Sequence, residues 1–179
     1  MSLPEHYRHF FRTQLRFALI MIAVALLTGI CFQESAKKVT ISQAVPVGAH
    51  LEYILGLALV HGHTFVLGVL MPLALSWVLF LGLSMGLPAL SALTLRASSA
   101  LYLPGVVVVV LLMLVKSYHF VLGVRHGGTD FSAINDSFMG ANHTLRAGLY
   151  GLSHAAMAAG LAIFAVGFWR AMNQSTKTA

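Results

Sequence analysis

Three histidines stand where membrane-spanning helices would hold them near the middle of a bilayer. His61 and His63 lie in the apolar stretch Leu51–Leu83, and His154 lies at nearly the same depth in the stretch His143–Trp169. An ionisable side chain at that depth is costly, so it usually serves a ligand, a proton path or a cofactor. Imidazole suits iron, copper and zinc, and haem iron is commonly held by histidine. Two helices that offer imidazoles at matched depth predict a haem b with two histidine ligands.

His61 and His63 cannot both bind one iron from the same helix. They differ by about 200° around a helix of 3.6 residues per turn. One should face the bundle centre, and the other a neighbouring helix, a second cofactor or a backbone carbonyl. We prefer His61 as the partner of His154 because it shares a helix face with Gly68 and Pro72. His63 is the close alternative.

The spacing of the histidines repeats between the two stretches. His50 and His61 are 11 residues apart, and so are His143 and His154. Eleven residues make about three helical turns, so each pair falls on one face, roughly 16 Å apart. Each of these helices would carry one histidine at the outer boundary of the membrane and one near its centre.

A third apolar stretch adds polar side chains in the segment MLVKSYHFVLG. Lys116 either snorkels towards the membrane surface or serves a haem propionate or a proton path. His119 is a candidate third-helix ligand, a substrate-side acid or a quinol contact. Around His154, small residues on its helix face would admit either a flat macrocycle or a neighbouring helix. These residues are Gly151, Ala155 and Ala158, next to Tyr150.

A second, outer group of histidines comprises His50, His126 and His143. It would bind a second haem, copper or zinc, or it would consist of ordinary polar residues of the boundary and loops. Arg125 and Arg146 lie at the same boundary, where they would suit haem propionates that point outwards.

Composition predicts an all-α polytopic membrane protein with a single four-helix domain over residues 1–179. The chain has 58% hydrophobic and 9% charged residues, and its mean hydropathy is +0.84. Four stretches are long enough to cross the hydrocarbon core. They are Leu15–Phe32, Leu51–Leu83, Ser98–Val124 and His143–Trp169. The second is longer than a bilayer requires, which predicts a tilt or a kink near Pro72.

The net charge of +6 follows the membrane topology and does not indicate nucleic-acid binding. Basic residues gather before the first stretch, between the second and third, and after the fourth. The positive-inside rule therefore predicts that both termini are cytoplasmic, in a multi-pass protein of the bacterial inner membrane. The segment HYRHFFRTQLRF has no cleavage site after the apolar run that follows it, so we expect a retained anchor. This segment should lie at the membrane interface, where His6 and His9 contact lipid headgroups or solvent.

Several activities are disfavoured by the motifs. The single cysteine, Cys31, excludes an internal disulfide and a multi-thiolate metal site. No CxxCH is present, so any haem is non-covalent. Hydrolase and nucleotide-binding motifs are missing from the sequence, and the few acidic residues weaken a cation-coupled transporter.

The chain resembles a family of small four-helix bacterial membrane proteins known as domain of unknown function 2871. The similar segments are LLTGICFQE, HGHTFVLG, MLVKSYHFVLG and GLYGLSHAAMAAG, in that order. A more distant similarity is to the haem–copper oxidase catalytic subunit and to haem–copper proteins linked to nitric oxide, which also use His-x-His within one helix. The resemblance implies a haem or haem–copper protein. The chain is shorter than the twelve-helix oxidase subunit and has no tyrosine–histidine crosslink motif, which disfavours oxygen reduction.

We therefore predict an integral membrane b-type haem protein for electron transfer or for binding nitric oxide or oxygen. It would hold one or two haems, with copper as an alternative cofactor, and a haem-dependent oxidoreductase is one form of this hypothesis. A homodimer, a redox partner subunit and a quinol are the partners expected besides the bilayer. The rival hypotheses are copper or zinc binding or transport, and a non-catalytic assembly subunit whose histidines only form hydrogen bonds between helices.

Overall fold

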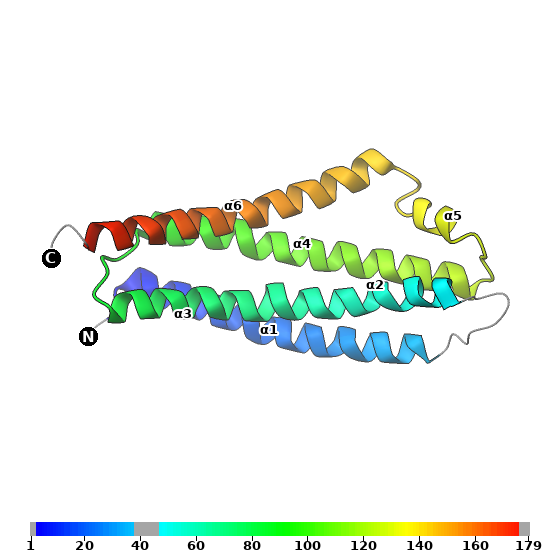
Figure 1. The fold of residues 1–179 in the computed structure, drawn as a ribbon, viewed down its shortest axis with the longest axis horizontal. Coiled ribbons are helices and arrows are strands. Elements are labelled where there is room, and N and C mark those ends of the chain that lie inside the picture. Colours follow the sequence, from blue (N-terminus) through cyan, green and yellow to red (C-terminus); the bar gives the residue numbers. More distant parts are fainter. Residues whose placement is uncertain (1–2, 38–46, 176–179) are drawn as a thin grey trace.

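The computed structural model describes residues 3–37 and 47–175, without the side chains of residues 36, 47–53 and 175. Four long helical rods lie side by side (Figure 1). In chain order the elements are α1 (Glu5–Ala36), α2 (Val47–Phe65), the π-helical segment η1 (Val66–Leu70), α3 (Met71–Ser84), α4 (Ala92–Arg125), α5 (Phe131–Asp136) and α6 (His143–Ser175). The second rod consists of α2, η1 and α3, which follow one another without a break.

All four rods are long and apolar enough to span a membrane, as the composition predicts. Large apolar side chains point away from the bundle, among them Ile20 at 63% exposure and Leu152 at 73%. A water-soluble monomer rarely leaves such extended apolar surface uncovered. The described residues therefore form a helical bundle whose length and apolar surface suggest a multi-pass membrane protein.

The helices extend beyond the predicted apolar stretches. α1 begins at Glu5, ten residues before the predicted start, so the expected interfacial segment is a continuous part of the first membrane helix. Tyr7, Phe10 and Gln14 on one face of this segment are buried against the bundle. A hydropathy window detects apolar runs and misses an amphipathic extension of a helix. The signal for that extension was the recurrence of apolar residues every three to four positions.

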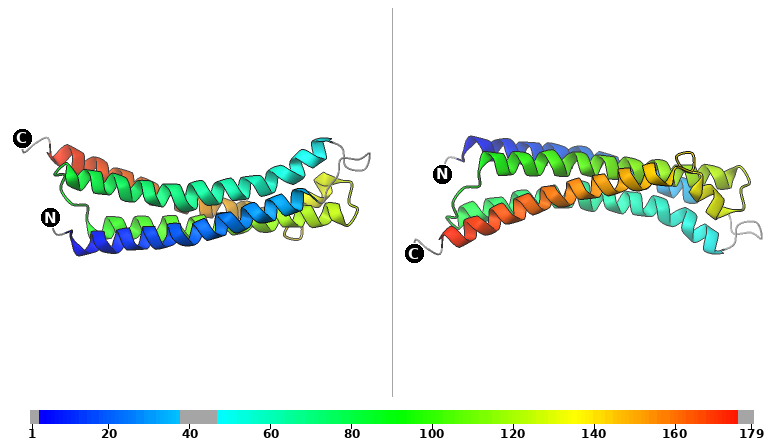
Figure 2. Two further views of the ribbon diagram at one scale, coloured as in Figure 1. Left: turned by 90° about the horizontal axis from the view of Figure 1, so that it is seen from below. Right: turned by 90° about the horizontal axis from the view of Figure 1, so that it is seen from above.

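The second rod is curved, and η1 lies just before Pro72 (Figure 2). Proline has no amide hydrogen and cannot continue the regular ladder of hydrogen bonds. At this point the Met71 amide donates to the Val66 carbonyl, five residues back. The Leu67 carbonyl accepts a hydrogen bond of 2.8 Å from the Tyr102 hydroxyl of α4. The predicted disturbance near Pro72 thus takes the form of one π-helical turn that α4 supports.

α6 packs closely on α4 through glycines. A Cβ atom on Gly160 would lie 2.8 Å from both the Ser98 carbonyl oxygen and the Tyr102 amide nitrogen. A Cβ atom on Gly105 would lie 2.7 Å from Met157 Cγ. Towards its N-terminal end, α6 diverges from α4 and meets the loop that contains α5 (Figure 1). The two helices are therefore in backbone contact at one end and separated at the other.

We expect Gly160→Ala to destabilise the protein, because its neighbours at 2.8 Å are backbone atoms that cannot move aside. Overpacking of this kind costs about 1–3 kcal/mol, which outweighs the gain of about 1 kcal/mol in helix propensity. The measurement is the thermal unfolding midpoint in detergent. Gly148→Ala is the matched control in the same helix, since a Cβ atom there meets nothing within 4 Å. Equal midpoints for the two variants would contradict the close contact.

Candidate functional site

A cavity of about 430 Å³ lies between α2, α4 and α6, in the half of the bundle where α6 diverges. Its volume falls within the range of about 300–1,000 Å³ typical of ligand pockets. The lining residues are Gly56, Leu59 and His63 of α2; Met113, Lys116, Ser117 and Phe120 of α4; Asn135 of α5; and Tyr150 and His154 of α6. Two of the three predicted central histidines therefore meet at one cavity.

His63 and His154 have the same hydrogen-bond arrangement. The Nδ1 of His63 lies 2.8 Å from the Leu59 carbonyl oxygen, and that of His154 lies 2.7 Å from the Tyr150 carbonyl oxygen. A carbonyl oxygen only accepts, so Nδ1 carries the proton in both rings. In the neutral imidazole Nε2 then keeps its lone pair, which is the state that binds a metal ion. Each helix thus fixes its own histidine in a ligand-ready tautomer.

His61 does not line this cavity, so the structure does not bring together His61 and His154, the pair that the sequence analysis preferred. Its ring faces α1, where Nδ1 donates to the Ala25 carbonyl at 2.8 Å. A Cβ atom on Gly29 would lie 3.0 Å from the same nitrogen, so the glycine makes room for the ring. The expected angular separation places His61 against the neighbouring helix and leaves His63 to face the cavity.

Lys116 is half-buried at the edge of the cavity and makes no hydrogen bond or ion pair with the described part of the chain. Leu59, Met113 and Phe120 form an apolar wall beside it. A cation next to an apolar cavity suits a ligand that combines a flat hydrophobic body with an anionic group. Of the two alternatives for Lys116, the cavity contact favours a role towards a ligand.

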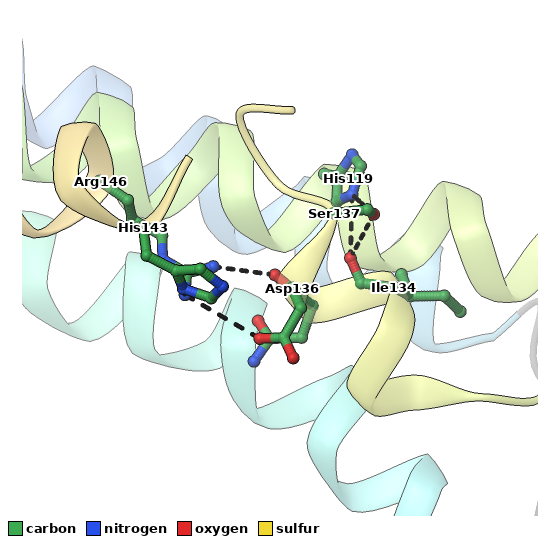
Figure 3. A network of polar contacts seen from close by, with 7 residues as sticks. His119, Ile134, Asp136, Ser137, His143 and Arg146 are labelled. Carbon is green, nitrogen blue, oxygen red and sulfur yellow. Dashed lines mark hydrogen bonds and ion pairs between the residues drawn. The ribbon is translucent and has the colours of Figure 1, made fainter. Parts of the chain in front are cut away.

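His119 points away from the cavity, towards α5 (Figure 3). Its Nε2 lies 3.0 Å from the Ile134 carbonyl oxygen and 2.9 Å from the Ser137 hydroxyl. Because the carbonyl only accepts, Nε2–H is the donor. The ring also contacts Phe138, with 5.7 Å between ring centroids. The prediction that His119 is a third-helix ligand is not supported, since the nitrogen is engaged in holding the loop.

The outer residues form an electrostatic network (Figure 3). Arg146 donates to His143 Nδ1 at 2.6 Å and to the Asn135 carbonyl at 3.1 Å, and it lies 3.9 Å from Asp136. Arg146 therefore holds α5 against the start of α6 instead of facing outwards to a propionate.

The predicted outer metal site is not assembled in the described part of the chain. Among the described side chains, which leave out those of residues 36, 47–53 and 175, no three of His, Cys, Asp or Glu come together as a metal-binding group. Arg125 and His126 are exposed at the end of α4, and Arg125 does not reach the cavity. The side chain of His50 lies outside the described residues.

Sequence reasoning missed several lining residues, although a signal for them existed. Met113, Ser117 and Phe120 lie at helical intervals around Lys116, so that lysine marked their common face. Gly56 lies seven residues before His63 in the same way. No sequence signal marked Asn135. It reaches the cavity beside α2 and α6 only because the loop that contains α5 folds back onto the bundle.

Comparisons with protein-family models, curated proteins and solved structures found no significant match to this chain. The resemblance described from the short motifs therefore stays a hypothesis.

His119→Ala should release the loop that contains α5, because the imidazole donates to the Ile134 carbonyl and contacts Phe138. Loss of a hydrogen bond worth about 1 kcal/mol corresponds to roughly five- to tenfold faster amide exchange where opening is local. Hydrogen exchange followed by mass spectrometry over residues 131–138 measures this effect. His126→Ala, at an exposed position nearby, is the control. Unchanged exchange in the His119 variant would show that the bond does not hold the loop.

Proposed function

We propose that this protein is an integral membrane b-type haem protein, with His63 of α2 and His154 of α6 as the axial ligands. Its work is electron transfer or the binding of a small diatomic gas. The single observation that supports this most strongly is that two imidazoles from different helices line one cavity, each with its Nδ1 proton donated to a carbonyl of its own helix.

The number of donors favours haem over a bare metal ion. A structural zinc site takes four protein ligands and a catalytic one takes three. The cavity offers two imidazoles, and the described residues contain no group of three metal-ligating side chains. Haem supplies four nitrogen ligands itself and needs only one or two from the protein. Two histidines are therefore a complete set for haem and an incomplete one for zinc.

The hydrogen bonds at Nδ1 do two things for these histidines. They orient each ring and raise the basicity of Nε2, as partners of metal-ligating histidines generally do. They also give each Nδ1 proton an acceptor within its own helix. A histidine that only satisfies its own helix would form the same bonds. The assembly-subunit hypothesis therefore predicts the same geometry but no haem spectrum.

The remaining lining residues match the parts of a haem. Met113 and Phe120 offer apolar contact to a macrocycle, and Lys116 offers a cation to a propionate. When bound, the haem supplies reversible one-electron chemistry or a site for a diatomic gas. The chain positions two imidazoles at one cavity and orients each through its Nδ1 hydrogen bond.

We place the end of the bundle where α1 begins and α6 ends in the cytoplasm of a bacterium. That end carries Arg8, Arg12, Arg16, Arg96 and Arg170 against Glu5. The opposite end mixes basic residues with Glu34, Asp130 and Asp136. The excess of positive charge favours this orientation. It puts His63 and His154 in the half of the bundle that lies towards the periplasm.

His154→Ala and His63→Ala should each abolish or shift the reduced α-band of the detergent-purified protein. Loss of an axial ligand should weaken haem binding more than loss of a hydrogen-bond partner of that ligand does. We therefore expect the haem affinity to fall by more than about tenfold. Absorption spectra of the oxidised and dithionite-reduced protein, made under haem-replete conditions, measure both effects. Addition of carbon monoxide then separates the two activities, because two firmly bound imidazoles leave no open position.

His61→Ala is the matched control, two residues from His63 on the same helix. It removes the hydrogen bond to Ala25 and should lower stability by about 1–3 kcal/mol while the spectrum stays unchanged. A colourless wild type would overturn the proposal. So would a spectrum that is lost in His61→Ala and kept in His63→Ala.

Lys116→Met should lower the midpoint potential of the haem. The reduced haem carries one positive charge fewer than the oxidised haem, so a nearby cation favours reduction. Removal of a charge about 10 Å away at an effective dielectric of about 20 shifts the potential by tens of millivolts. A spectroelectrochemical titration gives the value, and Lys116→Arg serves as the charge-preserving control. Equal potentials for both variants would show that Lys116 does not face the cofactor.

A further inference from the structure

A second groove lies between α1 and α4, at the end of the bundle where both helices begin. Its volume is about 410 Å³, and it is separate from the histidine cavity, with which it shares no lining residue. The lining residues are His6, His9, Phe10 and Thr13 of α1, and Ala92, Leu95, Arg96, Ser99, Ala100, Leu103 and Pro104 of α4. The proposed haem function makes no use of this groove.

The deepest residues of the groove are apolar. α1 and α4 run in the same direction, away from this end of the bundle (Figure 1). His9 and Arg96 lie nearer the start of their helices, whereas Leu103 and Pro104 lie deeper. Seven residues separate Arg96 from Leu103, which corresponds to about 10 Å along a helix. The groove thus carries the cationic Arg96 and the hydroxyls of Thr13 and Ser99 before an apolar floor at Leu103 and Pro104.

Two hydroxyl groups in the groove have protons to donate. Gln14 is 1% exposed, and its Nε2 donates to Ser99 Oγ at 3.0 Å. Ser99 is the acceptor in that bond, and its own proton has no acceptor among the described residues, nor does that of Thr13. Together with the guanidinium of Arg96, the groove presents donors and no carboxylate, which is the chemistry of a phosphate site.

The charge of the surroundings points to the same kind of ligand. The exposed residues Arg8, Arg12 and Arg16 follow one another at four-residue intervals along the same end of α1. Glu5 is the acidic residue at this end of the described chain. Basic pockets between membrane helices bind the headgroups of anionic lipids, and basic residues near the surface add to that attraction.

We propose that this groove binds one anionic phospholipid. Its phosphate lies at Arg96, Thr13 and Ser99, and one acyl chain lies deeper, along Leu103 and Pro104. A free phosphate ion would use the same donors but leave the apolar floor uncovered, so a lipid matches the whole groove. The bound lipid would fill the space between α1 and α4 beside the buried Gln14, the only amide side chain that links these two helices in the described chain.

The test is native mass spectrometry of the detergent-purified full chain, mixed with phosphatidylglycerol or with phosphatidylcholine. We expect retention of phosphatidylglycerol to exceed that of phosphatidylcholine and to fall about tenfold in Arg96→Gln, the loss typical of one charged hydrogen bond. Arg170→Gln is the matched control, because this exposed arginine lies at the same end of the bundle on α6. Its retention should match that of the wild type.

Ala100→Trp is a second variant that leaves every charge in place. Ala100 is exposed and lines the groove, so a tryptophan there fills the groove without disturbing the core and should displace the lipid. Three results would overturn the proposal. They are equal losses in Arg96→Gln and Arg170→Gln, equal retention of the two lipids by the wild type, and complete displacement of phosphatidylglycerol by millimolar inorganic phosphate. None of these results depends on whether the protein binds haem.

Discussion

The close packing of α6 on α4 is the constraint on which the rest of the bundle depends. Gly160 lies against the backbone of α4 at Ser98 and Tyr102, and Gly105 admits Met157. Helices in lipid gain little from apolar burial against each other, so close backbone approach and good packing must hold them together. Because these contacts are confined to one half of the pair, α6 is held there and diverges in the other half. The histidine cavity lies where the two helices separate.

The two halves of the bundle therefore serve different purposes. Around Tyr102, the first half is closely packed, and even the π-helical carbonyl of Leu67 finds a donor there. The other half leaves space between α2, α4 and α6, and its end is closed by polar bonds together with a small apolar cluster in which Phe131 and Ile134 of α5 pack on α4. His119 and Arg146 provide these bonds by holding α5, which carries Asn135 to the cavity. Hydrogen bonds are directional, so they fix this loop without filling the space beside it.

The histidines differ in what their hydrogen bonds leave free. His63 and His154 donate within their own helices, whereas His61 and His119 donate to other segments of the chain. An imidazole that joins two segments is committed to structure. One that bonds its own helix keeps both its orientation and a free nitrogen for a ligand. This difference distinguishes the two candidate ligands from the other histidines of the apolar stretches. The amino-acid sequence alone does not distinguish them.

Length and hydropathy alone predict four helices long and apolar enough to span a membrane. The two-residue separation of His61 and His63 likewise requires that they face different ways. Which of them lines the cavity with His154 depends on how the helices pack, because periodicity gives relative angles and the neighbours of a helix set the absolute one. The position of Asn135 and the engagement of His119 by α5 were likewise hidden, since both depend on a loop that returns to the bundle. Hydropathy measures the cost of placing each residue in lipid and does not specify which helices contact one another. The cavity therefore could not be predicted from the sequence.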